Sequence, residues 1–384
     1  MVCGILSKIV YQTRTELMSY SYRYQKILVI ATHCIGDSLL ISVFTRSLRE
    51  AFPQAQIDVL VNARGEMVFG TNPDVDNLVV MPGRPSLNDY YRLLKENGRY
   101  DLVVNEMLND RTAIYGLVFG KKRIGAIENS HSTAWLKKCV YSQHIEEQNR
   151  FEHKMSRAAR ILSLIGVDAV PHLVSPEEPL PIDLEKSLPK DYLVVHAPSS
   201  NSLKQWPILY WVELIQHLLQ EGYHVVLTGA ALERDQTIVS DIIKGIPKSE
   251  RLHSMLAELS LAQTSKLIKG SCGFIGPDSG PGHLASGYNI PIVSIISVAP
   301  ASMWSPWPYE QPIDIHSNLY YNAVKSQRVK NVKLIQSERN CVPCYKNKCA
   351  ISNDLHSPCL VDIQPKLVLE AVKEMMPLSV EHDC

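Results

Sequence analysis

Residues 26–61 have the sequence KILVIATHCIGDSLLISVFTRSLREAFPQAQIDVLV, which sets the fold class. KILVIAT suits a strand buried on both faces, because its apolar side chains follow one another without alternation. The run ends at Gly36 and Asp37; residues 38–52 have helical spacing, and residues 57–61 form a second apolar run. This pattern predicts a βαβ unit, the building block of a parallel sheet with helices on both faces.

The same alternation continues along the chain. Further strands are predicted at 77–82, 100–107 and 122–127, with helical segments at 67–70 and 89–98. A second series has strands at 192–198, 223–229, 273–278 and 291–297, with helices at 209–222 and 232–245. Residues 171–190 contain five prolines and indicate an interdomain linker. We therefore predict an α/β protein with two doubly wound, parallel-sheet, Rossmann-like domains at 26–180 and 181–340, between a leader (1–25) and a Cys-rich segment with a last helix (341–384).

The length and charge of the chain limit its function. A chain of 384 residues with 45% hydrophobic residues can bury two cores. Lys plus Arg equals Asp plus Glu at 39 each, so no charge excess indicates a nucleic-acid partner. No apolar run reaches the roughly 20 residues of a membrane span, and no signal peptide is recognisable. We expect a cytoplasmic protein, in which residues 1–26 form either a membrane-surface helix or a poorly ordered leader.

The run FIGPDSGPGH, residues 274–283, is the strongest candidate for a binding site. An apolar segment breaks there into a turn that exposes backbone N–H groups. If a helix begins at His283, those groups and the helix dipole would hold an anion such as a phosphate. The alternative is a structural connection between a strand and a helix, since such turns are common.

Residues that directly follow the strands are the other candidates, because ligands of open α/β sheets bind at the carboxyl ends of the strands. In the first domain, Asp37 is either a helix cap or a general base that takes a proton from a hydroxyl nucleophile. His33 is an alternative base, or a polar loop residue. In the second domain the candidates are Lys204, Thr228, Gly229, Glu233, Asp278, Ser279, Gly280 and His283.

Two of these side chains have clear alternatives. Lys204 suits a phosphate as a mobile point charge, or is a solvated surface lysine. Glu233 could accept hydrogen bonds from sugar hydroxyls, or only favour the start of its helix. The chain lacks the P-loop, the G-x-G-x-x-G turn and the G-x-S-x-G elbow. Phosphate-binding turns without the motifs of a kinase or a dehydrogenase indicate a substrate whose transferred group is already activated by linkage to a nucleotide.

Four of the nine cysteines lie together as Cys341, Cys344, Cys349 and Cys359. Their C-x2-C-x4-C-x9-C spacing resembles that of a structural Zn or Fe site, although the gaps are looser than in a zinc ribbon. The alternatives are reduced cysteines that pack a small subdomain, or a ligand set completed by His356. Four thiolates leave no open position on a metal, so we expect no catalytic role.

The chain resembles the glycosyltransferase family 9 heptosyltransferases of lipopolysaccharide core synthesis. The matching segments are KILVIATHCIGDSLLISVFTRSLREAFPQAQIDVLV, HAPSSNSLKQWPILYWVELI, LTGAALERD, FIGPDSGPGHLASGYNIPIVSII and the Cys-rich tail. The resemblance implies a GT-B fold, two Rossmann-like domains that face each other across a cleft. It implies inverting transfer of heptose from ADP-heptose, with Asp37 as base and the second-domain candidates as donor site. No cofactor would be required for this chemistry.

The acceptor side is less defined. The resemblance implies a lipopolysaccharide core or similar glycan acceptor, and the basic, aromatic residues 1–26 favour an acceptor at the cytoplasmic face of the inner membrane. Arg64, Lys122 and Arg123 could bind acceptor phosphates or carboxylates, or simply face water. The family's G-P-T is replaced by Ser297-Val298-Ala299-Pro300, so the donor base or sugar could differ. A relative with another nucleotide sugar or a protein acceptor, and a non-catalytic nucleotide-sugar-binding scaffold, remain alternatives.

Overall fold

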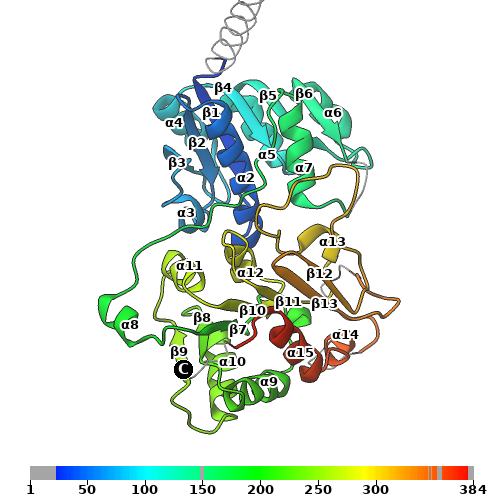
Figure 1. Cartoon of the computed structure of the whole chain (residues 1–384). Helices are drawn as coiled ribbons and strands as arrows, with labels where there is room; N and C mark the ends of the chain where they lie inside the picture. The colour runs from blue at the N-terminus through cyan, green and yellow to red at the C-terminus, as the bar shows by residue number, and fades with distance from the viewer. Residues whose placement is uncertain (1–22, 148–150, 345, 347, 353–356, 379–384) are drawn as a thin grey trace, which may run out of the picture. The chain divides into compact units, whose positions relative to one another are not determined.

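The computed structural model describes residues 23–147, 151–344, 346, 348–352 and 357–378. The chain forms two compact units (Figure 1). The first comprises Met1–Arg150 and Ser156–Val170, and the second comprises Phe151–Met155 and Pro171–Cys384. Among the described residues, no helix combines the length and the apolar character needed to cross a membrane. The leader, residues 1–22, and His356 lie outside the described residues.

The first unit contains a six-stranded parallel sheet in the order β3-β2-β1-β4-β5-β6. Its strands are β1 (Lys26–Ala31), β2 (Gln56–Val61), β3 (Asn77–Val80), β4 (Tyr100–Asn105), β5 (Gly120–Ile127) and β6 (Gln143–Glu146). Its helices are α2 (Ile35–Ala51), α3 (Glu66–Phe69), α4 (Leu87–Asn97), α5 (Asp110–Phe119), α6 (Ala134–Val140) and α7 (Lys154–Ser163); the first two residues of α7 belong to the second unit. The predicted βαβ start of the chain is thereby confirmed.

Local sequence explains these elements. Five of the six residues of β1 are buried, as expected for a central parallel strand covered on both faces. Helix α2 packs on β1 and β2, and α5 packs on β4 and β5. Helix α4 begins with a capping box, in which the Ser86 side chain accepts from the Asp89 N–H and the Asp89 carboxylate accepts from the Ser86 N–H.

The second unit contains a seven-stranded sheet in the order β12-β13-β11-β10-β7-β8-β9, parallel except for the β12–β13 hairpin. Its strands are β7 (Leu193–His196), β8 (Val225–Gly229), β9 (Leu252–Leu256), β10 (Gly273–Pro277), β11 (Ile292–Ile296), β12 (Ser326–Val329) and β13 (Val332–Gln336). Its helices are α8 (Ile182–Ser187), η1 (Ser202–Lys204), α9 (Ile208–Gln220), α10 (Glu233–Lys244), α11 (Leu261–Lys269), α12 (Gly280–Ala285), α13 (Ala301–Trp304), α14 (Pro358–Val361) and α15 (Pro365–Met375).

The core of the second unit includes the C-terminal helices. Trp206 and Trp211 are fully buried and meet edge to face, with ring centroids 4.8 Å apart. The Trp206 indole N–H donates to the Ile363 carbonyl, between α14 and α15, and α15 packs on α9. An edge-to-face pair contributes about 0.5–1.5 kcal/mol beyond its buried area. The last helix is therefore part of this core.

The proline-rich segment 171–190 is not a free linker throughout. Leu173 and Val174 are buried, and the Ser175 hydroxyl donates to the Leu284 carbonyl on α12. Helix α8 lies within the same segment and has no buried residue. Proline count indicates an irregular backbone but does not reveal whether the side chains between the prolines pack on a neighbour.

Gly125 in β5 offers a stability test, because a Cβ there would lie 2.5 Å from the Asn105 carbonyl oxygen and 2.7 Å from the Tyr141 ring. We expect Gly125→Ala to lower the free energy of unfolding by about 1–3 kcal/mol, the usual cost of overpacking. Gly116 in α5 is the matched control, since a Cβ there would meet no atom within 4 Å. Gly116→Ala should be neutral or stabilising. Urea unfolding measures both, and equal stabilities would contradict the packing of β5 on β4.

Candidate active site

The strand order of the first sheet reverses at the adjacent strands β1 and β4, whose connections lead away in opposite directions. Such a switch point leaves a crevice at the carboxyl ends of the two strands. Ile30 of β1 is paired with Asn105 of β4, so the residues just beyond them lie at this edge. Those residues include His33 after β1 and Glu106 after β4.

The His33 imidazole lies between two carboxylates. Its Nδ1 is 3.7 Å from Asp37 Oδ2, and its Nε2 is 3.3 Å from Glu106 Oε2. The Asp37 side chain is 34% exposed, His33 is 11% exposed and Glu106 is 1% exposed. Exposure thus falls along the series, and Asp37 is the member best able to meet a substrate. Asp37 is in the first turn of α2, whose cap residue Cys34 makes no side-chain cap hydrogen bond.

Two further interactions fix this edge. Asn62, just after β2, donates from its side-chain amide to the carbonyls of Thr32 at 3.1 Å and His33 at 3.0 Å. Arg157 on α7 contacts Glu106 Oε1 at 3.2 Å and also donates to Glu147. The Arg157 side chain is 1% exposed. The loop that carries His33 is therefore tied to β2, and Glu106 is held by a buried cation.

The three cations expected to bind the acceptor do not come together. Arg64 is exposed in the turn after β2, at the carboxyl edge. Lys122 and Arg123 lie near the start of β5, where Lys122 pairs with Leu102 and Arg123 with Val103, towards the opposite end of the strands. The Arg123 guanidinium donates to the backbone carbonyls of Val140, Gly120 and Lys121. Only Arg64 of these three shares the edge of Asp37.

The second sheet reverses at β7 and β10, and the predicted donor residues follow these strands. Asp278 comes directly after β10, and Lys204 ends the short helix η1 that follows β7. Lys204 Nζ lies 2.6 Å from Asp278 Oδ2; the lysine side chain is 25% exposed and the aspartate 5%. The two candidates thus form one ion pair whose cation reaches solvent.

Helix α12 begins at Gly280 rather than at His283. Pro281 in its first turn explains the earlier start, because proline is pre-organised for that position and lacks the N–H that would be unsatisfied there. Within the described residues, the buried atoms Ser279 Oγ and His283 Nδ1 have no hydrogen-bond partner. Burial lowers the pKa of His283 to about 4, so the ring is neutral at pH 7. A bound ligand could satisfy both atoms.

Thr228 and Gly229 end β8 at the same edge. The Thr228 hydroxyl lies 3.1 Å from Nδ1 of the buried His196. Glu233 is exposed at the start of α10, whereas Asp235 is buried and accepts from the Ala230 N–H at 3.0 Å. Asp235 therefore holds the turn, and Glu233 is the carboxylate that faces solvent.

His153 also lies in the second unit. Its Nε2 is 3.1 Å from the Ser305 carbonyl oxygen, and its ring is 4.7 Å from that of Trp307. Burial lowers its pKa to about 3, with a further contribution from His283. Sequence reasoning missed His153, as it missed Glu106, Asn62 and Arg157. Asn62 alone had a local signal, since it directly follows the apolar run predicted as a strand at 57–61, whereas Glu106 lies inside the predicted strand 100–107.

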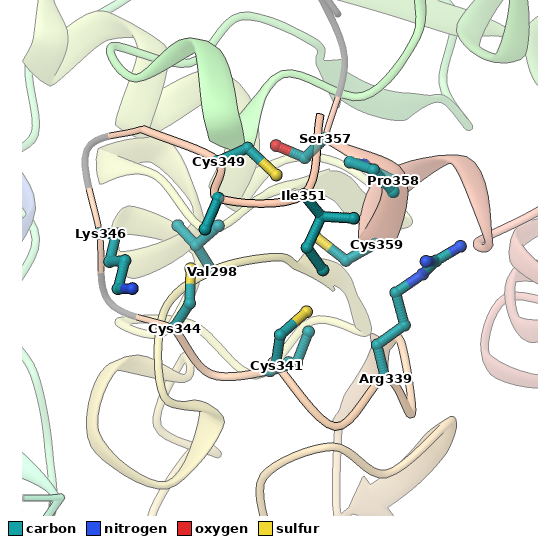
Figure 2. Close-up of a pocket in the computed structure, with 12 residues that line it drawn as sticks. Val298, Arg339, Cys341, Cys344, Lys346, Cys349, Ile351, Ser357, Pro358 and Cys359 are labelled. Carbon is teal, nitrogen blue, oxygen red and sulfur yellow. The ribbon is translucent and has the colours of Figure 1, made fainter. Parts of the chain in front are cut away.

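The four clustered cysteines line one cavity of about 70 Å³ with Val298, Arg339 and Ile351 (Figure 2). Burial and the other three cysteines raise the pKa of the Cys359 thiol to about 11. Among the described residues, however, no three His, Cys, Asp or Glu side chains are grouped closely enough to hold a metal ion. The predicted metal site is therefore a shared cavity rather than a formed ligand set.

Two Rossmann-like units of this kind, each built on a largely parallel sheet, define the GT-B fold. E. coli ADP-heptose lipopolysaccharide heptosyltransferase II has a similar fold, with a TM-score of 0.66 and 20% identity over 91% of this chain and 98% of that chain. The iron-containing dodecameric glycosyltransferase TibC of enterotoxigenic E. coli gives a TM-score of 0.51 and 14% identity over 92% of this chain and 76% of that chain.

Residues 92–336, more than half of the chain, match the model of glycosyltransferase family 9 (heptosyltransferase), and the chain belongs to this family. E. coli lipopolysaccharide heptosyltransferase 3 is 25% identical over 290 residues, which cover 71% of this chain and 83% of the relative. The protein is therefore a glycosyltransferase, as the sequence predicts.

Burial of three histidines makes the second unit acid-sensitive. The pKa is lowered to about 3 for His153 and to about 4 for His196 and His283. As pH falls through about 6.5, the unfolded chain takes up protons that the folded chain does not. Stability should thus be highest above pH 6.5 and decline as pH falls toward 4.

Urea unfolding of the intact chain at several pH values tests this prediction. His153→Gln should reduce the acid-side loss of stability, whereas His217→Gln, on the exposed side of α9, should leave it unchanged. An unaltered loss in His153→Gln would show that His153 does not take up a proton on unfolding in this range.

Proposed function

We propose that the protein transfers a heptose from ADP-heptose to a lipopolysaccharide core or similar glycan acceptor, with inversion at the anomeric carbon. The proposal rests on the carboxyl edge of β7 and β10. The Lys204–Asp278 ion pair lies there, and the turn that follows Asp278 contains the buried Ser279 Oγ and His283 Nδ1 atoms, which have no hydrogen-bond partner among the described residues. The partly exposed Lys204 ammonium can pair with a diphosphate, and the two polar atoms without partners can form hydrogen bonds to a bound nucleotide. The related E. coli enzyme is named for ADP-heptose, which supports this choice of donor.

In the proposed reaction, Asp37 accepts the proton of the acceptor hydroxyl as that oxygen bonds to the anomeric carbon. The bond between the anomeric carbon and the diphosphate oxygen breaks, and its electron pair leaves with ADP. Lys204 and the N–H groups of the turn at 278–283 balance the charge of the departing diphosphate. Glu233 is proposed to accept hydrogen bonds from donor hydroxyls, and Arg64 to meet an anionic group of the acceptor.

The donor is tested by thermal stabilisation with a panel of nucleotides, because a ligand that binds only the folded state raises its melting temperature. We expect ADP and ADP-heptose to stabilise the protein, and UDP- and GDP-sugars to leave it unchanged. Lys204→Ala should weaken ADP binding about tenfold or more, the value of a hydrogen bond to a charged group.

Lys244→Ala is the matched control for this variant. Its side chain is 75% exposed on α10 of the same unit, and its loss should leave ADP binding unchanged. Stabilisation by a UDP- or GDP-sugar instead would show that the donor is not ADP-heptose, and the proposed transferase activity would stand. No stabilisation by any nucleotide would contradict the proposed function.

Transfer itself is tested with Asp37→Asn, which keeps the size of the side chain and removes the base. We expect kcat to fall about 10²–10⁴-fold, the usual contribution of general base catalysis. ADP binding should stay at the wild-type level because the donor residues are in the other unit. Asp101→Asn, at a carboxylate that pairs with Lys121 at the opposite end of the sheet, serves as the control. Full activity in Asp37→Asn would exclude Asp37 as the base.

We further propose that Cys341, Cys344, Cys349 and Cys359 hold a structural Zn or Fe ion. The shared cavity and the thiol donor set support this, and the relative TibC is described as iron-containing. Deprotonated thiolates would have to draw together around the ion. Metal analysis of the purified full chain should find one ion per chain, and Cys359→Ser should lose it. If the wild-type protein contains no metal, the proposed metal site is refuted and the four cysteines serve only in packing.

A cytoplasmic location at the inner face of the membrane is part of the same proposal. A lipid-linked acceptor would be presented there, and the basic, aromatic residues 1–26 suit a membrane surface. Cell fractionation of the full chain, followed by a salt wash, tests this location.

A further inference from the structure

The series Asp37, His33 and Glu106 at the edge of the first sheet suggests more than a single base. The two ring nitrogens of His33 face two different carboxylates, at 3.7 Å and 3.3 Å. A neutral imidazole carries one proton, and the nitrogen that carries it is set by the hydrogen-bonding partner of that nitrogen. The negative charge of the buried Glu106 carboxylate, 3.3 Å from Nε2, favours the proton there, although the two atoms do not form a hydrogen bond in this structure. Nδ1 then has a lone pair that faces Asp37.

Glu106 is suited to this positioning because it is fixed and enclosed. Its side chain is 1% exposed and contacts the equally buried Arg157, which also binds Glu147. Removing charges from water is costly, so this arrangement is not explained by stability alone. The charged groups that face His33 are Asp37 on α2 and Glu106 after β4, and Arg157 on α7 lies behind Glu106.

We propose that His33 is a proton relay behind Asp37, positioned by Glu106. This inference rests on the proposed transferase function. As the acceptor oxygen bonds to the anomeric carbon and ADP departs with the bonding electron pair, the hydroxyl proton passes to Asp37. It then passes to His33 Nδ1, which regenerates the Asp37 carboxylate. Both N–H groups of the imidazolium now face a carboxylate, and the proton returns to water through Asp37 after product release.

The relay makes His33 and Glu106 positioning residues, whereas Asp37 is the residue that touches the acceptor. His33→Gln keeps a polar side chain of similar reach but cannot accept a proton. We expect kcat to fall about tenfold or more, at the low end of acid–base effects, with an unchanged acceptor KM. His131→Gln, at an exposed histidine of the same unit, should retain wild-type kcat.

The pH profile separates a relay from a merely structural role. Transfer by the wild type should decline on the acid side, and the acid limb of the His33→Gln profile should differ from that of the wild type, because only Asp37 then remains to accept the proton. Glu106→Gln should move the limb to lower pH, because the imidazolium loses the carboxylate that stabilises it. Circular dichroism and the urea-unfolding transition of each variant report whether the first unit is folded. Wild-type kcat and an unaltered acid limb in His33→Gln would overturn the relay.

Histidine NMR gives a readout that needs no activity. The His33 ring signal is identified by its loss in His33→Gln, and its titration is followed in the wild type, Asp37→Asn and Glu106→Gln. We expect the His33 titration to move to lower pH in both variants. A titration that neither variant moves would overturn the relay even if transfer is confirmed. A wild-type protein that binds no nucleotide and transfers no sugar would instead refute the proposed function, whatever the titration shows.

Discussion

The rest of the structure depends on one topological constraint. In each sheet the chain adds parallel strands first on one side of a central pair of strands and then on the other. In the first unit the two central strands are β1 and β4, and in the second they are β7 and β10. Connections that leave in opposite directions cannot cover the carboxyl ends of the central pair, so backbone turns and polar side chains gather there. The edge with Asp37 and the edge with Asp278 have the same topological origin.

The two edges use charge in different ways. In the first unit, the carboxylates of Glu106 and Glu147 enclose the Arg157 guanidinium away from water. In the second unit, Lys204 pairs with a buried Asp278 but keeps a quarter of its side chain exposed. A buried ion pair holds its two side chains in place, because neither charge can turn to water. A pair with an exposed cation keeps electrostatic attraction available for an incoming anion.

The central strands of both sheets could be predicted from the sequence, because buried parallel strands have local signatures, whereas β6, β9, α5 and α11 were not predicted. The sequence did not reveal partners that are distant along the chain: Arg157 is 51 residues from Glu106, and Asn62 is 29 from His33. Buried polar pairing of this kind depends on tertiary packing. Lys122 and Arg123 were predicted to bind the acceptor from their charge alone. The strand register places them towards the amino end of β5, away from the edge that carries Asp37. The helix at 280–285 begins earlier than expected because Pro281 suits a first turn.

The short segment Phe151–Met155 belongs to the second unit, although the residues on both sides of it belong to the first. Within the second unit, the Phe151 carbonyl accepts from the Ser302 hydroxyl, and His153 meets Ser305 and Trp307. A gene fusion that joins this second unit to the first unit of a relative must therefore transplant two pieces of sequence. A fragment that starts at residue 171 would leave an unfilled gap beneath Trp307. Recombination between family members with a single crossover would separate residues that pack as one core.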